Sequence, residues 1–153
     1  MEIAATLPAT DERVPRHTSA HVNKRIQGRT LHDVSRYIGA DPVFIDERIH
    51  ELEREWDIER TLEANAASVA LVGLALGVSV DRRFLLLPAA VATFLLQHAL
   101  QGWCPPLPLF RRLGIRTSRE IHDEILALRI LRGDFLERTE SPERALANAR
   151  NWS

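Results

Sequence analysis

Two long stretches without a charged residue occupy the middle of this chain. Residues 64–80 make seventeen such positions and residues 84–103 make twenty, and only Asp81, Arg82 and Arg83 separate them. A transmembrane α-helix needs about 20 mainly apolar residues. Two such stretches joined by a short charged turn are typical of antiparallel spans, with the arginines reaching toward lipid phosphates. The pattern therefore predicts a transmembrane helical hairpin over residues 63–103.

A soluble helical bundle that buries the same hairpin is the alternative. Polar side chains within the two stretches would also suit a buried helix pair: Asn65, Ser68, Gln97, His98 and Gln101. A chain of 153 residues has room for one modest core and little more. The pairing of the two stretches around a charged turn favours the membrane.

The residues before the hairpin divide into a tail and amphipathic helices. Residues 1–28 show no apolar period and no signal-peptide run, which predicts a disordered tail that stays in the cytoplasm. In residues 30–38 the apolar side chains share one helical face, with Thr30 as N-cap and Gly39 as the end. We expect cytoplasmic amphipathic helices over residues 29–62.

A second amphipathic helix is expected to begin at Pro42. Asp41 can cap it, and proline fits the first helical position because the missing N–H costs no hydrogen bond there. One apolar stripe follows: Ile45, Ile49, Leu52 and Trp56. Since no Pro or Gly lies between Asp46 and Ser68, we expect this helix to continue unbroken into the first span.

After the hairpin the sequence predicts a loop, one more helix and a second tail. Residues 104–116 contain three prolines, which cannot continue a helix, and are predicted to form a proline-rich interfacial loop. Thr117 and Glu120 make a capping-box pattern for an amphipathic cytoplasmic helix over residues 117–135. Residues 136–153 contain few apolar side chains and are expected to be a tail. The apolar stripe of the helix is Ile121, Ile125, Leu128, Leu131 and Phe135.

Positive charge is concentrated at the outer ends of the two stretches. The arginines there are Arg48, Arg54, Arg60, Arg111, Arg112, Arg116 and Arg119, against Arg82 and Arg83 in the turn. By the positive-inside rule, both termini should face the cytoplasm of a bacterial inner membrane. The net charge of −1 offers no basic field for a phosphate backbone, so we expect a lipid bilayer and not nucleic acid as partner.

Cys104 is the candidate thiol of this sequence. As the single cysteine it excludes an intrachain disulfide and a cysteine-only metal site within these residues. It follows the second stretch directly, at the expected cytoplasmic face of the membrane. A helix C-terminus disfavours a thiolate, and Arg111 and Arg112 would offset this only if the proline loop folded back. The alternative is a small packing residue at the interface.

A polar patch precedes Cys104 at the end of the second stretch. Gln97, His98 and Gln101 fall within two helical turns, and an ionisable group inside a span indicates a functional site. The alternative is interhelical hydrogen bonding to two polar residues at the same depth of the first span, Asn65 or Ser68. Zinc would need two ligands beyond His98 and Cys104, so we expect no metal.

Small residues in the first stretch predict close helix packing. Gly73 and Gly77 are four positions apart, and Ala66 and Ala70 have the same spacing. In a membrane such pairs let two helix backbones approach each other, since packing there depends on dispersion rather than on hydrophobicity. The contact lies either within the hairpin or between two protomers.

Several motifs resemble the YgaP-like transmembrane domain family. They are Glu-Trp-Asp-Ile-Glu-Arg at 55–60, Leu-Gln-Gly-Trp-Cys-Pro-Pro at 100–106 and Leu113-Gly114, within a match over roughly residues 60–115. Members are two-helix membrane segments, some fused to a rhodanese sulfurtransferase domain, with a Gly-x-Cys-Pro element that corresponds here to Gly102–Pro105. The resemblance implies a membrane location and a homodimer. Sulfurtransferase activity is not carried over, because this sequence has no α/β sulfurtransferase pattern.

Taken together, these features predict an all-α protein without a catalytic grouping. No Ser-His-Asp set, phosphate loop or zinc signature is present, and Glu55, Asp57 and Glu59 are expected to form a solvated charged face. We expect a non-enzymatic membrane anchor without a cofactor, whose flanking apolar stripes dock a second copy or an unknown partner protein. The alternative function is sulfur handling or redox sensing by Cys104.

Overall fold

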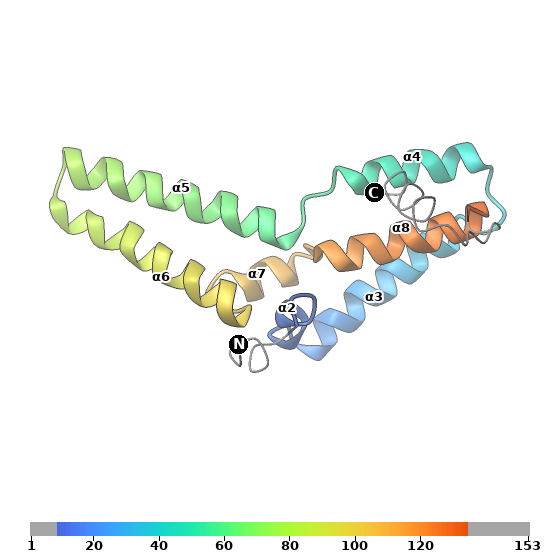
Figure 1. The fold of residues 1–153 in the computed structure, drawn as a ribbon, viewed down its shortest axis with the longest axis horizontal. Coiled ribbons are helices and arrows are strands. Elements are labelled where there is room, and N and C mark those ends of the chain that lie inside the picture. Colours follow the sequence, from blue (N-terminus) through green and yellow to red (C-terminus); the bar gives the residue numbers. More distant parts are fainter. Residues whose placement is uncertain (1–8, 135–153) are drawn as a thin grey trace, which may run out of the picture.

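The chain folds into helices that form two arms (Figure 1). The computed structural model describes residues 9–134 and contains no strand within them. The hairpin arm is the pair α5 and α6, and the head is α3, α4 and α8, with α2 and α7 between the two arms. The predicted all-α class is confirmed. The elements are α2 (Arg13–Arg16), α3 (Ala20–Ser35), α4 (Pro42–Glu53), α5 (Ile58–Ser79), the 3₁₀ helix η1 (Arg82–Leu85), α6 (Leu86–Gln101), α7 (Leu107–Arg112) and α8 (Ser118–Arg132).

The hairpin arm has the antiparallel helices that the sequence predicts. Both of its helices are long and apolar enough to cross a membrane. Gly73 and Gly77 of α5 are buried where this helix contacts η1 and α6. A Cβ atom on Gly73 would lie 2.7 Å from Pro88 Cδ, and one on Gly77 would lie 2.5 Å from Leu85 Cδ2. The glycine pair therefore serves the contact within the hairpin, where any side chain would hold the backbones apart.

The outer surface of the hairpin arm is apolar. Only 6 % of the second span is buried within the protein. Large exposed side chains on the two helices include Leu71, Val72, Val78, Leu86 and Leu96. A continuous apolar surface of this kind is uncommon on a protein surrounded by water and matches the hydrocarbon of a bilayer.

The prediction that α4 continues into the first span is wrong, because residues 54–57 separate α4 from α5. Asp57 Oδ1 accepts a hydrogen bond from the backbone N–H of Arg60 at 2.8 Å and so caps a new helix. In a continuous helix the Ile58 N–H would donate to the carbonyl of residue 54, but here it donates to the Arg116 carbonyl at 2.8 Å. A tertiary hydrogen bond thus interrupts a segment whose local sequence contains no helix breaker.

The head has a core between α4 and α8. The two predicted apolar stripes face each other there, through Ile45, Ile49 and Leu52 on one side and Ile121, Ile125 and Leu128 on the other. Two predicted members of the stripes stay outside this core, since Trp56 is 50 % exposed and Leu131 is 41 % exposed. The stripes therefore stabilise the head and are not free surfaces for docking.

The predicted tail over residues 1–28 is wrong from Arg13 onward. Helices α2 and α3 occupy most of this region, and Val14, Val22 and Ile26 are buried. Helix α3 begins after Ser19 and runs through Thr30, which therefore lies inside a helix instead of capping one. The apolar residues here are few, so their spacing was a weak signal of a helix. Residues 1–8 lie outside the described part of the chain.

The proline-rich segment 104–116 also contains a helix that the sequence did not predict. Pro106 and Pro108 lie at the start of α7, where a missing N–H costs no helical hydrogen bond. Leu107 is fully buried in a second apolar cluster, together with Cys104 and with residues of the hairpin and α2: Val14, Ile58 and Leu62. This cluster joins the hairpin arm to α2 and α7, the helices that lie between the two arms.

Helix α8 begins at the capping box that the sequence predicts. The Thr117 hydroxyl accepts from the Glu120 N–H, and the Glu120 carboxylate accepts from the Thr117 N–H, which completes the capping box. Gly133, with a φ of +89°, ends the helix. Phe135 and the tail predicted over residues 136–153 lie outside the described residues.

Candidate functional site

The candidate site lies where the hairpin arm meets the rest of the protein. Glu59 is in the first turn of α5, His98 is in the last turn of α6, and Arg13 begins α2. His98 Nε2 and Glu59 Oε2 are 2.8 Å apart, and Arg13 donates to Glu59 Oε1 at 2.9 Å. We call these three residues the polar cluster. It is held by elements that are far apart in the sequence, and His98 within it is only 5 % exposed.

Glu59 determines which imidazole nitrogen of His98 carries the proton. An arginine partner favours an ionised carboxylate, and an ionised carboxylate can only accept a hydrogen bond. In a neutral imidazole, Nε2 is then the donor and Nδ1 holds the free lone pair. Nδ1 is buried and has no hydrogen-bond partner among the described residues. The Cys104 side chain lies beside this imidazole.

Gly102 allows Arg13 to reach the polar cluster. Its φ of +78° ends α6 in the left-handed conformation, and a Cβ atom there would lie 2.6 Å from Arg13 Cβ. The same arginine also donates to the Ala99 carbonyl at 3.0 Å. The glycine of the Gly-x-Cys-Pro element is thus required twice, for the turn and for the close approach of α2.

The predicted polar patch is only partly brought together. His98 joins the cluster, whereas Gln97 is half-buried and Gln101 is exposed. The predicted alternative partners of His98 are also wrong, because the Ser68 hydroxyl donates to its own helix at 2.8 Å and Asn65 is exposed. The sequence places these residues at a similar depth, but the partner that the fold supplies is Glu59.

The prediction that Glu55, Asp57 and Glu59 form a solvated face is wrong. Glu55 binds the Arg116 guanidinium through both oxygens, at 2.8 and 2.6 Å. Asp57 caps α5, and Glu59 belongs to the polar cluster. All three carboxylates therefore have bonded partners near the start of α5.

Arg116 connects this junction to a buried charge network in the head. It also donates to Glu124, which is fully buried and accepts from Arg48 at 3.2 and 2.9 Å. Burial lowers the pKa of the Arg116 guanidinium, but its hydrogen bonds to Glu55 and Glu124 outweigh that effect and raise the pKa. Two arginines and two carboxylates thus neutralise one another around the buried Glu124 and Arg116.

A second buried ion pair joins α7 to α8. Arg111 is fully buried and donates to both oxygens of Glu120 at 2.7 Å. Its remaining hydrogen bonds go to Thr18, Asn23 and the Ile115 carbonyl. Burial raises the pKa of the Glu120 carboxyl, but the Arg111 guanidinium outweighs this and lowers it.

Sequence reasoning missed the roles of Arg13 and Arg111. Arg13 lies in the segment that was expected to be a tail, and Arg111 was considered only as a topology signal and as a cation that could reach Cys104. For the segment that contains Arg13, the available signal was Ser19, a residue type that favours helix N-caps, followed by Val22 and Ile26 at helical spacing. For Arg111 the local sequence offers no such signal, since its four hydrogen-bonding partners all lie outside α7 in segments that only the fold brings together.

An apolar pocket of about 180 Å³ lies between α5 and α6 and reaches Cys104. Its walls come from both spans, and Asn65 is the one polar residue that lines it. Ala66 lies on the wall, whereas Ala70, one turn further along, is half-buried outside it. Cys104 and two prolines close the end of the pocket that is nearest α7.

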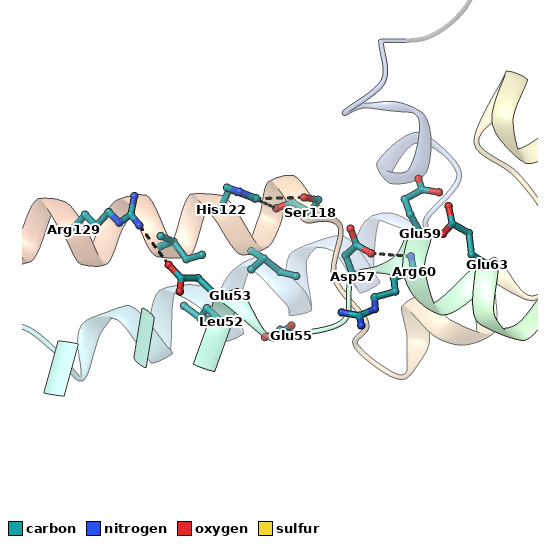
Figure 2. Close-up of a pocket in the computed structure, with 12 residues that line it drawn as sticks. Leu52, Glu53, Glu55, Asp57, Glu59, Arg60, Glu63, Ser118, His122 and Arg129 are labelled. Carbon is teal, nitrogen blue, oxygen red and sulfur yellow. Dashed lines mark hydrogen bonds and ion pairs between the residues drawn. The ribbon is translucent and has the colours of Figure 1, made fainter. Parts of the chain in front are cut away.

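A larger groove of about 740 Å³ lies between the α4–α5 junction and α8 (Figure 2). Carboxylates dominate its lining: Glu53, Glu55, Asp57, Glu59 and Glu63. Figure 2 shows Arg129 directed toward Glu53, at 3.6 Å, and Asp57 bonded to the start of α5. Because Glu55 and Glu59 also have cationic partners, most of the negative charge in this groove is already balanced.

Comparisons with known proteins add no relative. No protein-family model matches the chain, and no curated protein or solved structure matches it. Within residues 9–134, no group of three or more His, Cys, Asp or Glu side chains is placed to hold a metal ion. Function is therefore inferred from the residues described above.

Proposed function

We propose that this chain is a small integral protein of the bacterial inner membrane, related to the YgaP-like transmembrane domain family, that anchors a helical docking module at the cytoplasmic face. The observation that carries the proposal is the contrast in exposure between its arms. The hairpin arm exposes its apolar residues, whereas the head buries a core and a charge network. This contrast is explained if a bilayer surrounds the hairpin arm and water surrounds the head.

The dimensions of the hairpin arm support a membrane span. Helix α5 has 22 residues, which corresponds to about 33 Å at 1.5 Å per residue. The hydrocarbon core of a bilayer is about 30 Å thick. By the positive-inside rule, the arginine distribution supports an orientation with the head and both termini in the cytoplasm and the η1 turn, with Arg82 and Arg83, on the opposite face.

The docking surface of this proposal is the outer face of α3 and α8. The apolar stripes of α4 and α8 are buried in the core of the head, so the docking surface must consist of other apolar residues. A shallow groove of about 280 Å³ between these helices is lined by Leu31, Val34 and Ala127, among others. Leu31 is 72 % exposed, and Ile130, on the same face of α8 as Ala127, is 60 % exposed. We call Leu31, Val34, Ala127 and Ile130 the α3–α8 face, which fits a second copy or a partner helix.

Fractionation of cells tests the membrane part of the proposal. We expect the protein to stay in the membrane pellet after a carbonate wash, and recovery in the supernatant would contradict it. For topology, single cysteines are introduced into a Cys104→Ser background at Arg82 and at Ser35, both exposed positions. A membrane-impermeant maleimide added to spheroplasts should label Arg82→Cys and not Ser35→Cys.

Mass measurement and crosslinking in a mild detergent test the docking part. We expect a dimer or a complex with a co-purifying protein, which Leu31→Glu combined with Ile130→Glu should disrupt. Lys24→Glu is the matched control, because Lys24 is an exposed residue of α3 outside the α3–α8 face. A lone monomer for the wild-type chain would contradict docking and leave the membrane anchor intact.

A further inference from the structure

The polar cluster and Cys104 form a thiol next to a positioned base. His98 is only 5 % exposed, its Nδ1 atom has no hydrogen-bond partner among the described residues, and the Cys104 side chain lies beside the imidazole. Glu59 occupies the other imidazole nitrogen at 2.8 Å and Arg13 holds Glu59 at 2.9 Å. A nucleophile, a base and a group that orients the base are the elements of an activated cysteine.

The pocket beside the thiol fits an alkyl chain. It has about 180 Å³ of space, walls from Val69 of α5 and Val91 of α6, and Cys104 at its cytoplasmic end. Asn65 and Pro105 on its rim are exposed, so the pocket opens to the surroundings of the hairpin. An alkyl chain entering there would extend between the spans into hydrocarbon, while a polar group attached to it would stay at the level of Cys104.

We propose that Cys104 accepts a long-chain acyl group from an acyl thioester, with His98 as general base and Glu59 as the residue that positions His98. Nδ1 takes the proton from Cys104 Sγ, and Sγ attacks the thioester carbonyl carbon. The new carbon–sulfur bond to Cys104 forms as the bond to the donor thiol breaks, and the departing thiolate takes the proton from Nδ1. The step exchanges one thioester for another and needs no oxidant or reductant. It rests on the membrane location proposed above for the hairpin arm and is independent of the docking function.

The shape of the site favours an acyl chain over sulfane sulfur as the group that Cys104 receives. A persulfide needs one additional sulfur atom and gains little from an apolar pocket between two spans. A long acyl chain buries its methylenes, and each buried methylene contributes about 0.8 kcal/mol, or about a fourfold increase in binding. The pocket therefore predicts a strong dependence on chain length.

Labelling of the full-length protein in lipid nanodiscs tests the proposal. Alkyne-tagged palmitoyl-coenzyme A is the donor, and the product is read by fluorescence after cycloaddition and by intact mass. We expect one label per chain that neutral hydroxylamine removes. Unlabelled palmitoyl-coenzyme A should compete at least about tenfold better than acetyl-coenzyme A, by the methylene contribution given above. This comparison uses only the wild-type protein and so does not depend on the folding of any variant.

Substitutions separate the roles of the site residues. Cys104→Ser should abolish the label, and His98→Gln should lower the labelling rate by about 100-fold, the usual contribution of a general base. His32→Gln, on the exposed surface of α3, is the matched control and should label like the wild type. Circular dichroism of each variant shows whether it folds.

A second pair of variants tests the pocket. Ala66→Phe fills it and should slow palmitoyl labelling at least tenfold, by removing space for methylenes. Ala67→Phe, at the next and exposed position, should not. The proposal is overturned if palmitoyl and acetyl donors compete equally, or if His98→Gln labels at the wild-type rate. It is also overturned if Cys104 takes a persulfide-selective tag after polysulfide treatment but no acyl group, a result that would favour sulfur handling instead.

Discussion

The two arms of the molecule place their side chains by opposite rules. The hairpin arm exposes residues such as Val78 and Leu86 and brings its helices together at glycines. The head buries an aliphatic core and, beside it, complete ion pairs that include the fully buried Arg111 and Glu124. One arm is adapted to hydrocarbon on the outside, and the other to water.

This difference teaches where each arm should be sensitive to mutation. A buried ion pair is costly to assemble and stabilises the fold only while both partners are present, so loss of one partner leaves an uncompensated charge. Replacing a glycine at a close contact causes steric overlap, and shifts of the neighbouring side chains relieve part of that overlap. The head should therefore show the larger single-residue effects.

The largest effect is expected for Arg111→Ala. Removal of this guanidinium leaves the Glu120 carboxylate without its buried partner and should cost about 3–5 kcal/mol of the free energy of unfolding. Thermal unfolding in detergent, followed by circular dichroism, measures it. Arg112→Ala is the control, because its side chain is exposed, and should change stability by less than about 0.5 kcal/mol. Equal stability of the two variants would contradict the role of the ion pair.

The same ion pair predicts a pH dependence of the head. Since the pKa of Glu120 is lowered in the folded state from its ordinary 4.5, the stabilisation is present above that value and is lost as pH falls through the lower folded pKa. The free energy of unfolding should thus decrease below about pH 4.5. In Glu120→Gln this component should be absent. An unchanged acid slope in that variant would show that other carboxylates dominate.

A Gly→Ala substitution should lower the free energy of unfolding in the hairpin arm and raise it in the head. Gly73→Ala places a Cβ 2.7 Å from Pro88 Cδ and should destabilise the hairpin by about 1–3 kcal/mol. Gly28→Ala, inside α3 with no atom within 4 Å of the added Cβ, should stabilise by about 0.5–1 kcal/mol. Urea unfolding of both variants in the same detergent makes the comparison. Two changes of the same sign would mean that the glycines of α5 are not close contacts.

The smallest expected effects concern the helix caps, where the arms should not differ. Thr117→Ala removes the cap of α8 and Asp57→Ala removes the cap of α5, each at a cost of about 1 kcal/mol. Both caps lie on the head side of the apolar stretches, so the bilayer should not amplify either loss. Thermal unfolding of the two single variants tests this, with Ser118→Ala as an exposed control. A much larger loss for Asp57→Ala would place that cap inside the hydrocarbon.

Much of the fold follows from local patterns in the sequence. The hairpin follows from two uncharged stretches around Asp81, the start of α4 from Asp41 and Pro42, and the start of α8 from Thr117 and Glu120. Each of these signals involves residues within a few positions of one another. Spacing along the chain is therefore enough to recognise them.

The candidate site was decided by the tertiary structure. Cys104 and His98 could be named from the sequence, but Glu59 and Arg13 join them from positions 39 and 46 residues away from their partners. The break before α5 likewise depends on a hydrogen bond between Ile58 and Arg116. The sequence by itself determined the starts of α4 and α8 and which two segments are apolar enough for a membrane. Only the fold determined which charges meet, because an ion pair between distant segments leaves no period or spacing in the chain.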